Sequence, residues 1–204
     1  MQRRAPGVTL IECLVALALT ALCLALAMPS WQAALRAQRV RAAAASLHDA
    51  LRSARLHALQ HGCGVRLCPS ADGQHCQHAA RWEQGWVARG DAACLASAPA
   101  LAQAALAGVR IDASGALARG AGFDAAGWPR QPTGAWLMGR WRVCPWPPTA
   151  DARSGRELVL AAGGRLREHE CDCGAAPARP GLPRRTLAAS VLSAGSACCR
   201  PAWR

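Results

Sequence analysis

The chain contains no lysine, no asparagine and no tyrosine among its 204 residues, and it has a single phenylalanine. All 24 basic residues are therefore arginines, set against 12 acidic residues, and the formal net charge is +12. We attribute the use of arginine alone to GC-rich coding, so it does not in itself indicate phosphate binding. The excess of positive charge is a separate property. It favours a polyanionic partner such as nucleic acid, acidic lipid headgroups or an acidic protein.

The sequence also lacks the motifs of an enzyme. Serine and aspartate residues near the six histidines form no recognisable nucleophile motif, and no His-Glu-x-x-His metal pattern occurs. His57 and His61 are four residues apart on a predicted helix, but no third metal ligand accompanies them, so we interpret them as surface residues. We therefore expect no catalytic activity, no cofactor and no metal.

Charge is almost absent from a segment near the N-terminus. Between residues 10 and 28 the sole charged side chain is Glu12. A helix of this length measures about 28 Å, enough to cross a bilayer core, and the two arginines before it favour a cytoplasmic N-terminus. A signal peptide cleaved near residues 25–27 is the alternative. Against it, a carboxylate in an apolar segment costs about 2.5–3.5 kcal/mol at mid-bilayer and normally marks a partner.

A second helical pattern covers residues 30–61, after Pro29, which can kink a helix. Apolar residues at spacings of three and four form one stripe, which we expect to pack on a C-terminal domain. The stripe consists of Val40, Ala44, Leu47, Leu51, Ala54 and Ala58. Gly62 and Gly64 predict the end of this helix.

Beyond residue 62 the pattern changes to short strands and turns. A turn is predicted at residues 70–73, a hairpin at Gly163 and Gly164, and a short helix or loop at residues 98–107. The predicted strands cover residues 63–69, 85–89, 109–111, the vicinity of Phe123, 136–144, 157–161 and 165–168. Residues 174–204 are rich in Pro, Ala, Gly and Arg and contain no acid, which predicts a poorly ordered basic tail.

The tryptophans allow two interpretations. Trp82 and Trp86 could stack on nucleic-acid bases, but aromatic residues at strand ends are usually core residues, and we interpret both in that way. The same interpretation is made for Trp128, Trp136, Trp141 and Trp146.

The segment Gly7-Val8-Thr9-Leu10-Ile11-Glu12 resembles the processing motif of type IV pilins and type II secretion pseudopilins. The resemblance implies that a prepilin peptidase cuts between Gly7 and Val8 and methylates the new N-terminus. It also implies a role for Glu12 in assembly, because its carboxylate would pair with the N-terminal amine of a neighbouring subunit. Val8 stands where the family usually has phenylalanine.

Four internal segments, in this order and spacing, resemble the GspH/FimT family of minor pseudopilins. They are Leu67-Cys-Pro-Ser-Ala-Asp-Gly73, Trp82-Glu-Gln-Gly-Trp-Val87, Val143-Cys-Pro145 and Gly164-Arg-Leu-Arg167. The fold implied is α+β and type IV pilin-like, with a long N-terminal helix packed on a small antiparallel β-domain. We accordingly expect a leader (1–7), a transmembrane helix (8–29), an amphipathic helix continuing the spine (30–61), a periplasmic β-rich domain (62–173) and the basic tail (174–204).

The chain has eleven cysteines, and an outward-facing domain meets an oxidising compartment in which disulfides are the default. Cys68 and Cys76 flank a turn and are candidates for one disulfide. Cys144 with either Cys171 or Cys173 would tie a strand to the end of the last hairpin. A zinc site formed by Cys171, Cys173 and the pair at 198–199 is the alternative, although zinc knuckles prefer two-residue gaps.

Two functions remain open. One is a minor pseudopilin or minor pilin of a type II secretion pseudopilus or type IV pilus, anchored once in the inner membrane with a periplasmic C-terminal domain before extraction into the filament. The alternative is a DNA-binding minor pilin for transformation. Arg165 and Arg167 would share one strand face, about 7 Å apart, and the resemblance links this Gly-Arg-x-Arg pattern to DNA binding. Expected partners are prepilin peptidase, other pilins or pseudopilins, the inner membrane and, in the alternative, DNA.

Overall fold

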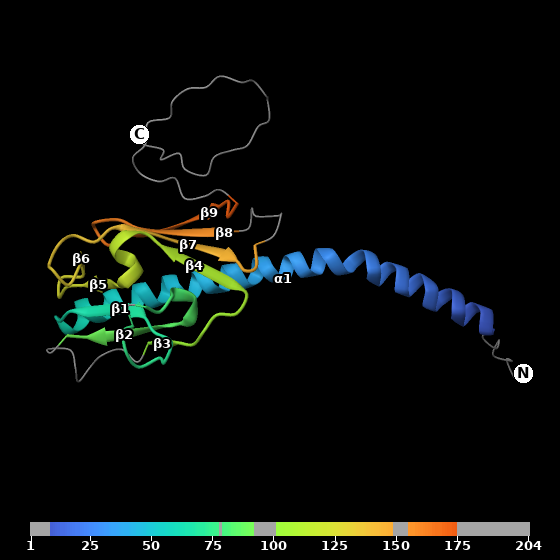
Figure 1. Ribbon diagram of the computed structural model, residues 1–204, viewed down its shortest axis with the longest axis horizontal. Coiled ribbons are helices and arrows are strands. Elements are labelled where there is room, and N and C mark those ends of the chain that lie inside the picture. The colour runs from blue at the N-terminus through green and yellow to red at the C-terminus, as the bar shows by residue number, and fades with distance from the viewer. Residues whose placement is uncertain (1–8, 78, 92–100, 149–154, 175–204) are drawn as a thin grey trace, which may run out of the picture. The chain divides into compact units, whose positions relative to one another are not determined.

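A computed structural model of the chain describes residues 9–77, 79–91, 101–148 and 155–174 (Figure 1). It begins with one 52-residue helix, α1 (Leu10–His61), and short strands follow. The chain forms two compact units, the first ending at Gln38 and the second beginning at Arg39. Helix α1 contributes to both units, which are described separately below.

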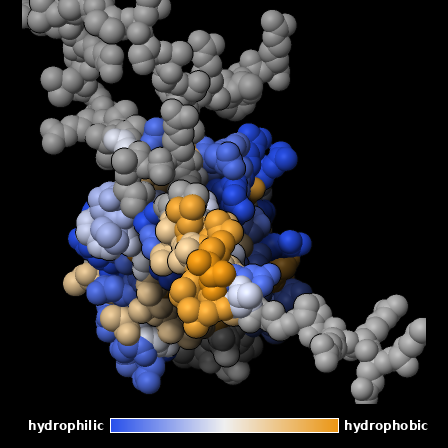
Figure 2. All heavy atoms as spheres, turned by 90° about the vertical axis from the view of Figure 1, so that its right-hand side faces the viewer, coloured by the Kyte–Doolittle hydropathy of each residue, from blue (hydrophilic) through white to orange (hydrophobic). Residues whose placement is uncertain are grey.

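The first unit consists of the apolar part of α1. The helix continues through residue 29, so the two helical patterns of the sequence form a single element. It is long and apolar enough to cross a membrane, and none of its apolar window is buried. Its large apolar side chains are exposed; Leu10 is 81 % exposed and Leu17 66 %. Apolar exposure of this extent is typical of a surface that contacts a membrane or another protein. Figure 2, viewed from the right-hand side of Figure 1, shows hydrophobic residues gathered in one continuous group.

The second unit begins with the rest of α1, which packs by one face. The six residues of the predicted stripe are all fully buried, which confirms the predicted packing face. Ala43 and Ala50 lie beside them and are buried as well. These residues belong to a single core cluster with side chains from both β-sheets, so this part of the helix is the shared centre of the domain.

Two antiparallel sheets complete the second unit. The five-stranded sheet has the order β3-β2-β1-β5-β6, formed by β1 (Val65–Pro69), β2 (Trp86–Gly90), β3 (Ala102–Gln103), β5 (Ala121–Phe123) and β6 (Pro129–Arg130). The four-stranded sheet has the order β4-β7-β8-β9, formed by β4 (Val109–Ala113), β7 (Gly139–Pro145), β8 (Gly155–Leu160) and β9 (Leu166–Cys171). Two short 3-10 helices, η1 (Trp82–Gln84) and η3 (Gly115–Arg119), lie between strands.

Each predicted strand overlaps an observed one, with ends shifted by a few residues, whereas β6 was not predicted. The interpretation of residues 98–107 as a short helix or loop is wrong in part. Residues 102 and 103 form β3 and pair with Val87 and Trp86 of β2. A strand of two residues is too short to show an alternating pattern in the sequence, and its pairing depends on β2, which is distant along the chain. Residues 98–100 lie outside the described part of the chain.

Three tryptophans form the centre of the core, as predicted. Trp82, Trp86 and Trp141 are at most 2 % exposed. The ring of Trp82 lies 6.3 Å from that of Trp86 and meets Trp141 edge-on at 5.7 Å. Its indole nitrogen donates to the carbonyl of Leu117 at 3.0 Å, so the buried polar atom has a partner.

The core interpretation is wrong for the other three tryptophans. Trp128, Trp136 and Trp146 are 44 %, 50 % and 52 % exposed. Trp128 and Trp136 flank the edge strand β6, and Trp146 directly follows the end of β7. The guanidinium of Arg130 lies 3.7 Å from the ring centre of Trp136, and that of Arg110 lies 5.5 Å from Trp146.

Candidate functional site

The start of α1 places Glu12 in the first helical turn. The hydroxyl oxygen of Thr9 accepts the backbone N–H of Glu12 at 3.3 Å, which caps the helix. A carboxylate at this position is favoured by the partial positive charge of the helix N-terminus. The Glu12 side chain is exposed and has no hydrogen bond or ion pair with any described residue. Gly7 and Val8 lie outside the described residues.

The cysteines of the second unit tie two loops to the sheets. Cys68 of β1 is bonded to Cys76, with the Cα atoms 5.4 Å apart, and Cys144 of β7 is bonded to Cys173, with the Cα atoms 5.7 Å apart. Of the two candidates for Cys144, the structure therefore selects Cys173, while Cys171 is buried beside it. The zinc alternative built on Cys173 is wrong, because this sulfur is already in a disulfide.

The two helix histidines are close without forming a metal centre. The rings of His57 and His61 lie 4.2 Å apart. Among the described residues, no group of three potential metal ligands occurs around them or elsewhere.

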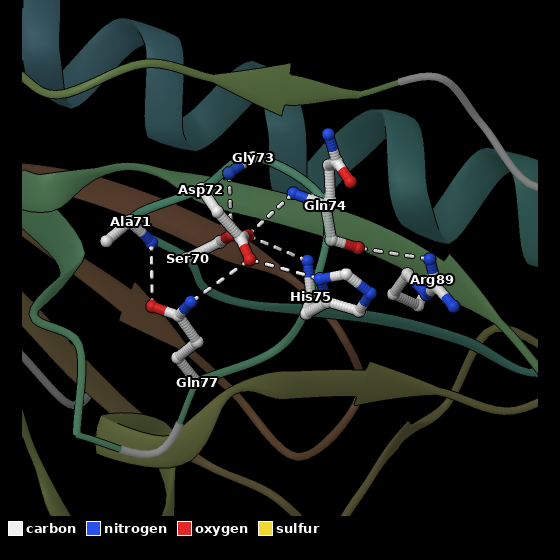
Figure 3. Close-up of polar contacts among 8 residues, drawn as sticks. All are labelled: Ser70, Ala71, Asp72, Gly73, Gln74, His75, Gln77 and Arg89. Carbon is white, nitrogen blue, oxygen red and sulfur yellow. Dashed lines mark hydrogen bonds and ion pairs between the residues drawn. The ribbon is translucent and has the colours of Figure 1, made fainter.

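The turn predicted at residues 70–73 is part of a loop organised by one carboxylate (Figure 3). Asp72 accepts backbone N–H groups of Gln74 and His75 at 2.8 and 2.9 Å. It also accepts the Ser70 hydroxyl at 2.8 Å and the Gln77 amide at 3.1 Å, and it lies 3.0 Å from His75 Nδ1. The carboxylate is satisfied within its own loop, so its role is structural.

The same hydrogen bonds favour the charged form of Asp72. The backbone N–H of His75, followed by that of Gln74 and by the side chains of His75 and Ser70, lowers the pKa of the Asp72 carboxyl far below its usual value. Two further contacts fix the loop to the sheet. The Cys68–Cys76 disulfide closes it onto β1, and Arg89 of β2 donates to the carbonyl oxygen of Gln74 at 3.0 Å.

The hairpin between β8 and β9 holds the arginines that the sequence singled out. Its turn is closed by hydrogen bonds from Ala161 N–H to the Arg165 carbonyl at 3.0 Å and from Gly164 N–H to the Ala161 carbonyl at 2.9 Å. Arg55 of α1 donates to the carbonyl oxygens of Gly164 at 2.6 Å and Gly163 at 3.2 Å. The core helix therefore fixes the tip of this hairpin.

Basic and acidic side chains alternate along β9 and the turn residue just before it. Glu168 and Glu170 lie on one face and pair with Arg156 of β8 at 3.7 and 3.1 Å. Arg165 and Arg167 alternate with them, are both exposed, and have no side-chain partner among the described residues. The arrangement leaves two guanidinium groups with no competing carboxylate on their own face of the strand.

Sequence reasoning missed Arg55 and the Asp72 network. The Ser-x-Asp-Gly composition indicated a turn and contained the signal for an aspartate that binds its own loop. No local signal identifies Arg55, because its partners lie more than 100 residues away in sequence.

The family described as type II transport protein GspH matches residues 43–164, and the prokaryotic N-terminal methylation motif matches residues 2–28. No curated protein matches the chain. A crystal structure of the type IV minor pilin FimU of Pseudomonas aeruginosa (strain PAO1) is similar, with 16 % sequence identity and a TM-score of 0.49, over 69 % of this chain and 94 % of that chain. Because the family match covers more than half of its length, the chain belongs to the type II transport protein GspH family, as a GspH/FimT-like minor pseudopilin.

Proposed function

We propose that the chain is a minor subunit of a type II secretion pseudopilus or type IV pilus, cut by prepilin peptidase between Gly7 and Val8 and methylated on the new N-terminus. The observation that carries this proposal is the Glu12 carboxylate. It is exposed and lacks a partner among the described residues, at the start of an apolar helix that the N-terminal methylation motif covers. Before assembly the protein crosses the inner membrane once, with the second unit in the periplasm.

Glu12 acts as the assembly contact in this proposal. A lone carboxylate within a bilayer costs about 2.5–3.5 kcal/mol. The N-terminal amine created by cleavage in a neighbouring subunit offsets this cost only when the two subunits are side by side. Incorporation into a filament therefore depends on the charge of residue 12.

Mass spectrometry and filament isolation test this proposal together. The mature protein should begin at methylated Val8. Glu12→Gln should leave cleavage intact and reduce incorporation into isolated filaments by about tenfold or more, because a single ion pair in apolar surroundings is lost. Thr9→Ala, which removes only the helix cap, is the matched control and should assemble. An intact Met1 terminus, or normal assembly of the Glu12→Gln variant, contradicts the proposal.

A second function, DNA binding by Arg165 and Arg167, is favoured by the absence of side-chain partners for these residues within the described part of the chain. Their guanidinium groups would each bind one backbone phosphate. Replacing both with glutamine should weaken duplex binding and reduce the salt slope by about 2, at roughly 0.9 per phosphate contact. The exposed pair Arg41→Gln and Arg52→Gln removes the same charge from α1 and is the control. Equal effects of the two double substitutions would remove the hairpin as a DNA site.

A further inference from the structure

The outer face of the five-stranded sheet carries a row of residues that are paired across the strands. Arg89 of β2 lies opposite Arg66 of β1, and Arg66 lies opposite Gly122 of β5. Gly122 lies opposite Arg130 of β6, and Arg130 forms a bridge with Trp136. Directly opposed residues of antiparallel strands point to the same face. The row, called the Arg66 row below, therefore presents three arginines and one tryptophan together over about 19 Å at about 4.8 Å per strand.

Arg66 is the unusual member of the row. It is half-buried, and it has no hydrogen bond or ion pair with any residue that the structure describes. Arg119 of η3 is exposed and equally without a described partner. Burial, and then the charge of Arg119, lower the pKa of Arg66. Two neighbouring guanidinium groups, one of them partly removed from water and neither in an ion pair with a described carboxylate, form an arrangement that an anion would stabilise.

The other arginines of the row have partners of their own. Arg89 donates to the Gln74 carbonyl, and Arg130 pairs with Asp124 at 3.3 Å. Positive charge without a described partner is therefore concentrated at Arg66 and Arg119, in the middle of the sheet face.

The surface around Arg66 is hollow. Gly122 places no side chain in the row, and a cavity of about 650 Å³ here is lined by Arg66, Gly122 and Arg130 and also by Asp91 and Asp124. A second cavity of about 550 Å³ is lined by Arg66, Arg119 and Leu137. Because Arg66 lines both cavities, a bound chain could place one anionic group on Arg66 and extend to either side.

One end of the row is aromatic. Trp136 follows Arg130 in the row and is half exposed, with the Arg130 guanidinium stacked on it at 3.7 Å and Trp128 meeting it edge-on at 5.9 Å. Arginines beside exposed aromatic rings are the pattern of single-stranded nucleic-acid sites, in which phosphates meet the arginines and an unpaired base stacks on the ring. Bases of a duplex are already stacked, and a lipid headgroup or an acidic peptide supplies the anion without the base.

We propose that the Arg66 row, together with the neighbouring Arg119 of η3, is a binding site for single-stranded nucleic acid. Arg66 and Arg119 bind backbone phosphates, and Trp136 stacks on a base. The site lies on a different sheet from Arg165 and Arg167 and does not depend on DNA binding by that hairpin. It prefers unpaired strands because its aromatic end needs a free base face.

The test measures fluorescence anisotropy with the full mature chain in detergent, using a labelled oligothymidylate of about 20 nucleotides and a duplex of the same length. Arg66→Gln with Arg119→Gln should weaken oligothymidylate binding about tenfold and reduce its salt slope by about 1.4, at roughly 0.7 per phosphate in a single strand. Trp136→Leu should weaken it roughly five- to 100-fold, from the loss of one stacked base, and should leave the salt slope unchanged.

Control variants separate this site from its alternatives. Arg41→Gln with Arg52→Gln removes the same charge and should have a smaller effect, and Arg165→Gln with Arg167→Gln should leave the preference for single strands in place. If Arg66→Gln impairs folding, Arg119→Gln alone should still reduce the salt slope by about 0.7. The proposal is overturned if both row variants bind the oligothymidylate like the unmodified chain, or if Trp136→Leu has no effect. It is equally overturned if the arginine variants lose only binding to phosphatidylglycerol vesicles.

Discussion

Replacing Gly164 with alanine tests whether Arg55 fixes the β8–β9 hairpin to helix α1. Gly164 has φ +76°, a left-handed conformation that costs a residue with a Cβ about 1–2 kcal/mol. An added Cβ would lie 2.7 Å from Arg55 Cζ and 3.0 Å from its Nε and Nη1. The guanidinium would have to move and give up its hydrogen bonds to the two glycine carbonyls, worth about 1.5 kcal/mol in this partly exposed setting. We expect a total loss of about 3 kcal/mol in the free energy of unfolding.

The assay is urea unfolding of the mature chain in detergent, followed by the fluorescence of the buried tryptophans. Gly134→Ala is the matched control, because Gly134 has φ +82° and no atom within 4 Å of an added Cβ, so it measures the backbone cost alone. In an Arg55→Met background, Gly164→Ala should cost only about 1–2 kcal/mol, because the clash and the hydrogen bonds are already gone. An equal cost of Gly164→Ala with and without Arg55 would refute the role given to this arginine.

Three further predictions concern stability. Asp72→Asn should destabilise the 70–77 loop and remove part of the loss of folding stability that the chain shows in acid. A carboxyl whose pKa is lowered by folding stabilises the fold fully above its unfolded pKa of about 3.9, and this stabilisation is lost as the pH falls through the folded pKa. Urea unfolding of both proteins at about pH 6 and pH 3 measures the difference. Cys144→Ser with Cys173→Ser opens a link across 29 residues and should cost about 3–4 kcal/mol in the free energy of unfolding under oxidising conditions, with no difference from the unmodified chain after complete reduction. Leu47→Ala should cost about 2–5 kcal/mol by leaving a cavity in the core, whereas Leu56→Ala, at an exposed helix position, should cost much less in the same assay.

The parts of the fold that local patterns specify were predictable. The stripe from Val40 to Ala58 follows from the helical period alone, and its six residues are all buried. The glycine pair at 163 and 164 predicted the hairpin, since a tight turn needs residues that tolerate positive φ. These signals act within a few residues of the chain.

Features that depend on distant pairing were not predictable from one sequence. Trp136 and Trp141 are five residues apart, yet one lies at a sheet edge and the other in the core, and only the strand order distinguishes them. The Arg66 row joins residues from 66 to 136 through four separate pairings, so no local motif marks it. The candidate site on the hairpin was found because Arg165 and Arg167 are neighbours in sequence, whereas Arg55, which fixes the hairpin, is not.

Strand β9 pairs only with β8 within the described residues, so its outer backbone groups form the open side of the four-stranded sheet. An open edge strand can pair with a strand of another molecule, and long charged side chains on the edge strand disfavour that pairing. Arg167, Glu168 and Glu170 supply them at three of the four exposed positions of β9, and Arg165 lies in the turn just before it. The charged side chains of β9 thereby disfavour edge-to-edge association of two copies of the chain through this strand.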